Sequence, residues 1–133
     1  MVKNLLTAVV ALLIAGPSLS AHHSFAAEYD GTKPVKVTGV VRRVEWANPH
    51  IWFYVEGRDE VTGRTAVWGF SAAPPGMLAR RGITKDALKI GDTIQVEGFL
   101  AKDGSANASG GRVTFADGRQ VFTASAEDSV PKP

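Results

Sequence analysis

Two β-rich segments meet at a proline corner, and this corner limits the possible fold more than any other feature of the chain. Residues 46–52 read Trp-Ala-Asn-Pro-His-Ile-Trp, so that Asn48 and Pro49 stand between the two segments. Proline lacks a backbone N–H donor and disfavours helical geometry in the residue before it. Apolar and polar residues alternate on both sides, as in half-buried strands. The stretch therefore predicts two strands joined by a sharp corner.

The same alternation recurs along the chain and predicts a mainly β fold. The predicted strands cover residues 35–46, 51–56, 65–70, 93–101, 112–116 and 119–124. Asp117 and Gly118 form a strong two-residue hairpin signal between the last two. Pro75 and Gly82 bracket a short helix over residues 75–81, between the third and fourth strands. This order predicts a small OB-like Greek-key barrel with one short helical connector. A small β-sandwich is the alternative.

The first long strand changes its apolar phase near Gly39. Val35 and Val37 share one face, whereas Val40 and Val44 fall on the other in a regular strand. Strand side chains alternate between faces, so a phase change needs an extra residue or a strong bend. We expect a bulge or bend at Gly39.

The N-terminus has the order of a secretory signal peptide, which we assign to residues 1–21. Lys3 gives a positive start, residues 5–16 are uncharged and mostly apolar, and small residues follow Pro17. An apolar run of about 12 residues is too short to span a bilayer core that needs roughly 20. We therefore expect no membrane anchor after cleavage and a periplasmic or secreted protein. Cleavage after Ser20 and cleavage after Ala21 both remain open.

Residues 22–133 have the length of one domain, with an N-terminal arm at residues 22–33 and a C-terminal tail expected to fray. The chain has no cysteine, which excludes disulfides and thiolate metal sites. Removal of Lys3 lowers the basic count from 15 to 14 against 13 acidic residues. An exported, nearly neutral domain does not suit nucleic acid as a partner.

Several motifs resemble those of a family of small exported bacterial proteins of unknown function. They are HHSF at residues 22–25, AEYD at 27–30, GVVRRVEWANPH at 39–50, and an IGD segment at 90–92 with Val96 and Gly98 after it. The resemblance implies an OB-like periplasmic domain and supplies no activity or ligand. Its motif positions here are His22, His23, Asn48, Pro49 and His50.

The three histidines of the chain are the candidate metal ligands. His22 and His23 open the mature chain, and His50 follows the proline corner. Imidazole is a common ligand of copper, zinc and nickel. Cleavage after Ala21 gives His22 a free amine, as in a copper histidine brace, whereas cleavage after Ser20 makes His23 the third residue of an amino-terminal Cu(II) motif. The alternative is that His50 only donates a hydrogen bond that fixes the corner.

Aromatic residues around the corner are candidates for a ligand surface. Trp46, Trp52 and Tyr54 lie on the predicted strands beside the corner, Trp68 lies on the third predicted strand, and Asn48 is polar at the corner. OB folds bind ligands by stacking, although such aromatics more often pack within the domain.

No nucleophile triad, phosphate loop or paired-carboxylate motif is present, so we expect a binding domain and not an enzyme. The expected ligand is Cu(II) or another transition metal ion. The alternatives are a structural module that binds an envelope protein and, more weakly, a copper-dependent oxidase with a histidine brace.

Overall fold

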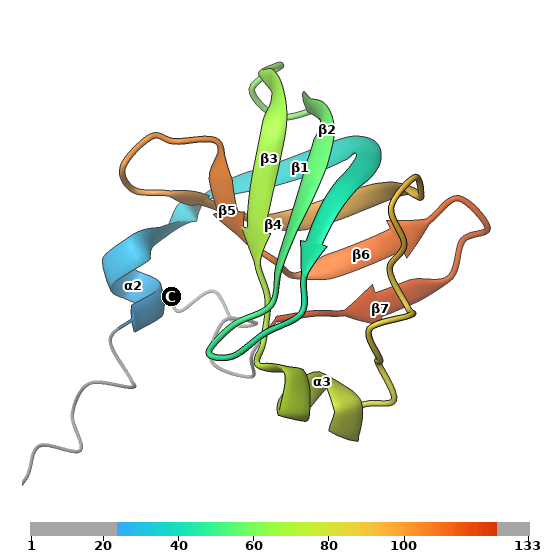
Figure 1. The fold of residues 1–133 in the computed structure, drawn as a ribbon. Coiled ribbons are helices and arrows are strands. Elements are labelled where there is room, and N and C mark those ends of the chain that lie inside the picture. Colours follow the sequence, from blue (N-terminus) through green and yellow to red (C-terminus); the bar gives the residue numbers. More distant parts are fainter. Residues whose placement is uncertain (1–23, 125–133) are drawn as a thin grey trace, which may run out of the picture.

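The computed structural model describes residues 24–124, and within this range the chain forms one seven-stranded sheet and two short helices (Figure 1). The elements in chain order are α2 (Ser24–Glu28), β1 (Tyr29–Glu45), β2 (Trp52–Asp59), β3 (Thr65–Ser71), α3 (Pro75–Arg80), β4 (Thr93–Ala101), β5 (Asn107–Ser109), β6 (Arg112–Phe115) and β7 (Gln120–Phe122). The predicted mainly β fold is confirmed. The predicted signal peptide and the tail beyond Ala124 lie outside the described residues.

Five strands form a ring. Their order is β1-β2-β3-β5-β4, and β1 also pairs with β4, which joins the two ends of that series. All these pairings are antiparallel except that of β3 with β5, which is parallel. The strands β6 and β7 continue from β4 as an antiparallel hairpin. The length of β1 makes the ring possible, because Val37 to Val40 pair with β2 and with β4 at once.

The core fills the ring with alternate residues of its strands. Phe53 and Phe70 stack with their ring centroids 5.3 Å apart, and Trp68 is fully buried beside them. Leu78 of α3 is also buried and belongs to this core. As Figure 1 shows, α3 lies below the strands, at the end of the sheet where β3 leaves it. The strand period of two therefore places the apolar residues as the sequence predicts.

In the pairing of β1 with β2, the irregularity lies at Arg42 and not at Gly39. The register with β2 runs regularly through Gly39 and shifts between Val41 and Arg43. The predicted bulge at Gly39 was wrong because Val41, and not Val40, is the fully buried residue of this segment. The alternation of buried and exposed residues in β1 changes only after Val41. Arg42, the extra residue in β1 relative to β2, is exposed.

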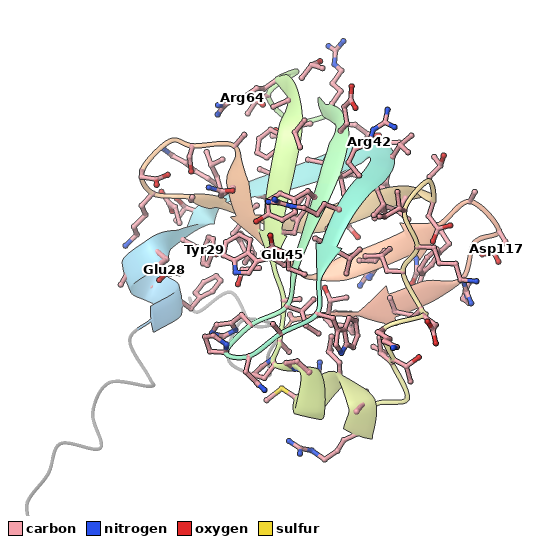
Figure 2. All side chains as sticks on the ribbon, in the orientation of Figure 1. Glu28, Tyr29, Arg42, Glu45, Arg64 and Asp117 are labelled. Atoms are coloured by element: carbon pink, nitrogen blue, oxygen red, sulfur yellow. The ribbon has the colours of Figure 1, made fainter. Side chains whose placement is uncertain are left out.

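The N-terminal arm packs on the domain, although not as an extended segment. Residues of α2 are helical, and β1 begins already at Tyr29. Phe25 lies edge-on to Phe99 of β4 at a centroid separation of 6.1 Å, and Tyr29 is buried. Lys102 fixes the helix further: its backbone N–H donates to Glu28 O, and its Nζ donates to Ala26 O. Figure 2 shows Glu28 and Tyr29 on the left of the domain.

Within residues 24–124, no helix is both long and apolar enough to cross a membrane.

Candidate functional site

The corner between β1 and β2 is held against the segment that follows β3. Ile51 and the residues after β3 exchange backbone hydrogen bonds: Ala72 N donates to Ile51 O at 2.8 Å, and Ile51 N donates to Ala73 O at 3.4 Å. Ile51, Ala72 and Ala73 are buried. The Asn48–Pro49 peptide bond is cis. The hydrogen bonds and the burial of Ile51, Ala72 and Ala73 hold the base of the corner in place, while the corner residues before it are exposed.

His50 is anchored to this base by its ring. Its Nδ1 lies 3.1 Å from the carbonyl oxygen of Ala72, and the rest of the side chain is exposed. A carbonyl oxygen can only accept, so Nδ1 carries the proton and donates it. In this tautomer Nε2 has a lone pair, and no described residue donates to it. The hydrogen bond to Ala72 O therefore sets the orientation of the exposed His50 side chain.

The other two candidate ligands, His22 and His23, lie outside the described residues, so their distance from His50 is not established. Within residues 24–124, no group of three or more His, Cys, Asp or Glu side chains is placed to hold a metal ion. His50 is therefore a single imidazole as far as the described part of the chain extends. The sequence places His23 directly before α2, which begins at Ser24.

The predicted aromatic surface separates into two parts. Trp52 and Tyr54 lie on the outer side of β2 and stack with centroids 6.4 Å apart and an interplanar angle of 23°. The guanidinium carbon of Arg43 lies 3.9 Å from the centre of the Tyr54 ring. Trp46 instead packs partly buried against the core beside Leu78, where a gap of about 20 Å³ remains. Trp46 therefore has a packing role.

Asn48 is exposed at the corner, and the structure gives its side chain no hydrogen bond to another described residue. It shares the corner with His50, whereas Trp52 and Tyr54 follow on β2. The sequence did not identify Arg43 or Ala72 as neighbours of these residues. The register pairs Arg43 with Tyr54, but the bulge at Arg42 that aligns them cannot be read from the apolar pattern. The partner of His50 is a backbone carbonyl, for which side-chain identity gives no signal.

Charges near the aromatic pair are balanced. Arg43 Nη2 and Glu45 Oε1 form an ion pair at 3.3 Å, and both groups are exposed. Figure 2 shows Glu45 near the middle of the domain, well separated in that view from Arg42 and Arg64 at the upper end. Because Arg43 already covers one face of Tyr54, that ring is less available for stacking with a ligand.

The fold and the corner define a small, mainly β domain that presents one oriented and exposed imidazole. The chain belongs to the family of unknown function DUF6152, whose model matches residues 10–111. The resemblance read from the sequence motifs to a family without an assigned function is thereby confirmed. Neither the curated proteins nor the solved structures contain a match to this chain.

Proposed function

We propose that this protein is an exported, OB-like domain of the periplasm or the extracellular space that binds a transition metal ion, with Cu(II) as the best fit. In this proposal His50 supplies one imidazole, and His22 or His23 supplies the others together with the free N-terminal amine. The observation that carries the proposal is the hydrogen bond from His50 Nδ1 to Ala72 O.

That hydrogen bond is of the kind that metal-binding histidines make. A ligating imidazole usually donates its second ring N–H to a carbonyl or carboxylate, which fixes the tautomer and the ring orientation. His50 meets this condition, and its side chain belongs to an exposed residue. A histidine that only stabilises the corner would make the same hydrogen bond, so this bond alone does not distinguish the two roles. The second support for the proposal is the position of the N-terminal arm.

The arm is anchored on the side toward which the corner projects. In Figure 1, α2 lies to the left of the sheet, and the corner between β1 and β2 extends from the lower end toward the same side. Phe25 and Lys102 hold α2 in place. Ser24, the first residue of α2, follows His23 directly in the sequence.

The strand order supports the OB-like part of the proposal. A ring with the order β1-β2-β3-β5-β4, a parallel β3–β5 pair and a helix between β3 and β4 has the connectivity of an OB barrel. In OB folds the loop between the first two strands borders the ligand-binding face. His50 lies in that loop.

Copper is favoured by the donor atoms. Imidazole and amine nitrogens suit Cu(II), which also binds more tightly than the other divalent first-row metals to most sites of this kind. A free N-terminal amine exists only after export and cleavage, so the site forms only in the mature protein. No observation among residues 24–124 favours oxidase chemistry over binding.

The test is a Cu(II) titration of the untagged mature protein with its natural N-terminus. We compare wild type, His50→Ala, the His22→Ala/His23→Ala variant, and a protein with a Gly-Ser extension that blocks the amine. Loss of a direct ligand should weaken binding by at least about tenfold, since removal of a second-shell partner alone costs 10–100-fold. The extension should weaken binding although it keeps all three imidazoles.

The variants separate the proposal from its alternatives. If His50→Ala binds Cu(II) as tightly as wild type while the extension abolishes binding, the amino-terminal motif acts alone and the shared site is wrong. If wild type binds no more copper than a variant without histidines, the domain is a structural module, and an envelope protein becomes the expected partner.

A further inference from the structure

A pocket of about 360 Å³ opens where β1, β4, β6 and β7 lie next to the end of β5, apart from the corner of His50. The lining includes the apolar side chains of Pro34, Phe99 and Phe122, the charged side chains of Lys36, Glu97 and Arg112, and three glycines, Gly98, Gly110 and Gly111. Its volume is within the range of small-molecule sites, at the lower end. His50 does not line it.

The pocket exists because glycines, which have no side chain, occupy the backbone where β5 leads into β6. A Cβ on Gly111 would lie 2.5 Å from Glu97 O, and a Cβ on Gly98 would lie 2.9 Å from the carbonyl carbon of Ser109. Real Cβ atoms do not approach backbone so closely, so both positions require glycine. The backbone of β4 therefore lies in close contact with the segment from β5 to β6, and the space beside this contact is left open.

Hydrogen bonds hold these strands in close contact. Phe99 N donates to Ser109 Oγ at 3.0 Å, and Gly110 N donates to Ser71 O at 2.6 Å. Gly111 O accepts from both the backbone N–H and the hydroxyl of Thr123, at 2.8 and 3.0 Å. The backbone around the pocket is thus held by four hydrogen bonds, and the pocket is preformed.

A row of cross-strand neighbours borders the pocket. In the strand register, Lys36 lies opposite Glu97, Glu97 opposite Arg112, and Arg112 opposite Phe122. The carboxylate of Glu97 therefore has one cation on each side. The Arg112 Nη1 to Glu97 Oε2 distance is 3.6 Å, and Lys36 Nζ lies 3.8 Å from Glu60 Oε2. These distances exceed the 2.7–2.9 Å typical of a charge-assisted hydrogen bond. Both cations therefore keep donors for a further anion, and the charged lining carries one net positive charge.

The apolar side of the pocket suits a flat ring. Phe122 is 46% exposed, which is unusual for an aromatic side chain of this size. The guanidinium carbon of Arg112 lies 5.7 Å from the Phe122 ring centre. A cation and an aromatic ring thus stand together at the rim, where one molecule can contact both.

We propose that this pocket binds a small aromatic anion, a carboxylate or sulfonate on one or two fused rings. The anionic group pairs with Arg112, and the ring lies against Phe122, Phe99 and Pro34. The pocket is independent of the metal site, and each proposal stands without the other.

The test follows backbone amide signals of the mature protein by NMR during titration with 2-naphthalenesulfonate. Saturable shifts should centre on Gly98, Gly110 and Gly111. Arg112→Gln should bind about fivefold more weakly, which corresponds to about 1 kcal/mol for one exposed charge pair. Phe122→Ser should also weaken binding. Arg119→Gln is the matched control, because Arg119 lies over the ring of Phe115 on the same hairpin and does not line the pocket.

The neutral analogue 2-naphthalenemethanol tests the charge requirement and should bind more weakly than the sulfonate. The same spectra report whether each variant is folded. The proposal is overturned if the sulfonate gives no saturable shifts, if shifts spread over the surface without a centre at the glycines, or if Arg112→Gln and Arg119→Gln bind it equally.

Discussion

Gly39 of β1 and Gly57 of β2 lie directly opposite each other, so close that a Cβ on Gly39 would be 2.7 Å from the Gly57 Cα. A Cβ on Gly57 would likewise lie 2.8 Å from the Gly39 Cα. The two strands approach each other where the ring closes, since Gly39 also pairs with Ile94 of β4. A side chain at either position would collide with the backbone of the opposite strand, so both positions require glycine.

Replacement of Gly39 by valine should destabilise the domain by about 2 kcal/mol or more, the range of costs for overpacking a tight site. Denaturant unfolding monitored by tryptophan fluorescence measures it. Gly31→Ala is the control, because a Cβ there meets no atom within 4 Å and it should have little effect. Equal stability of wild type and Gly39→Val would show that the strands can separate without cost.

Asp59 is a buried carboxylate that organises the loop between β2 and β3. Its oxygens accept from the backbone N–H groups of Lys36, Val61 and Thr62, and from the Thr62 hydroxyl at 2.6 Å. Burial alone raises the pKa of Asp59, but these hydrogen bonds together outweigh it and hold the pKa below its ordinary value. Asp59→Asn should cost about 2–3 kcal/mol, since hydrogen bonds to a charged group contribute about 1.5–3 kcal/mol each.

The same residue should make stability depend on pH. Because the folded pKa is lowered, the contribution of Asp59 is fully present above the unfolded value of about 3.9 and is lost as the pH falls through the folded pKa. Wild type should lose stability over that acidic window, and the loss should be smaller in Asp59→Asn. Asp86→Asn is the exposed control, because the Asp86 carboxylate accepts no hydrogen bond from another residue among residues 24–124. Parallel acid profiles for wild type and Asp59→Asn would contradict this account.

The bond from His50 to Ala72 predicts a modest effect in the absence of metal. His50→Ala should lower the free energy of unfolding of the apo protein by about 1 kcal/mol, the usual net value of one hydrogen bond. Thermal unfolding in the presence of a chelator measures this. A loss of several kcal/mol would indicate that the ring is mainly structural and would weaken the case for a metal ligand.

Export predicts a defined new N-terminus. Cleavage should occur within residues 18–22, because a charged start, an apolar run and small residues precede that point. Intact-mass measurement of protein from the periplasm or the medium identifies the first residue and decides between Ser20 and Ala21 as the last residue removed. A mass that still includes residues 5–16 would show that the segment is retained.

The regular strands could be predicted because they alternate with period two. The fourth strand, residues 93–101, was predicted with the bounds that β4 has, and the Asp117-Gly118 turn joins β6 to β7 as expected. The strand β5 was missed. It has only three small residues, Asn107, Ala108 and Ser109, and its existence depends on the parallel pairing with β3, a contact between distant parts of the chain.

The candidate site could be predicted only in part for a similar reason. His50 and the corner stand out in the sequence by residue type, and the structure adds that the ring is oriented by Ala72. The pocket beside Gly98 has a weak signal in hindsight, a glycine inside a strand and the Gly110-Gly111 pair. Its charged row arises from the register between β1, β4 and β6, which no local pattern encodes.

The central claim is that His50 and the N-terminal histidines bind one copper ion together. Pulsed EPR of mature protein loaded with one equivalent of Cu(II) detects the remote nitrogen of each coordinated imidazole and so counts the imidazole ligands. The account predicts at least two imidazoles in wild type and one fewer in His50→Ala. The same imidazole count in both proteins would contradict it.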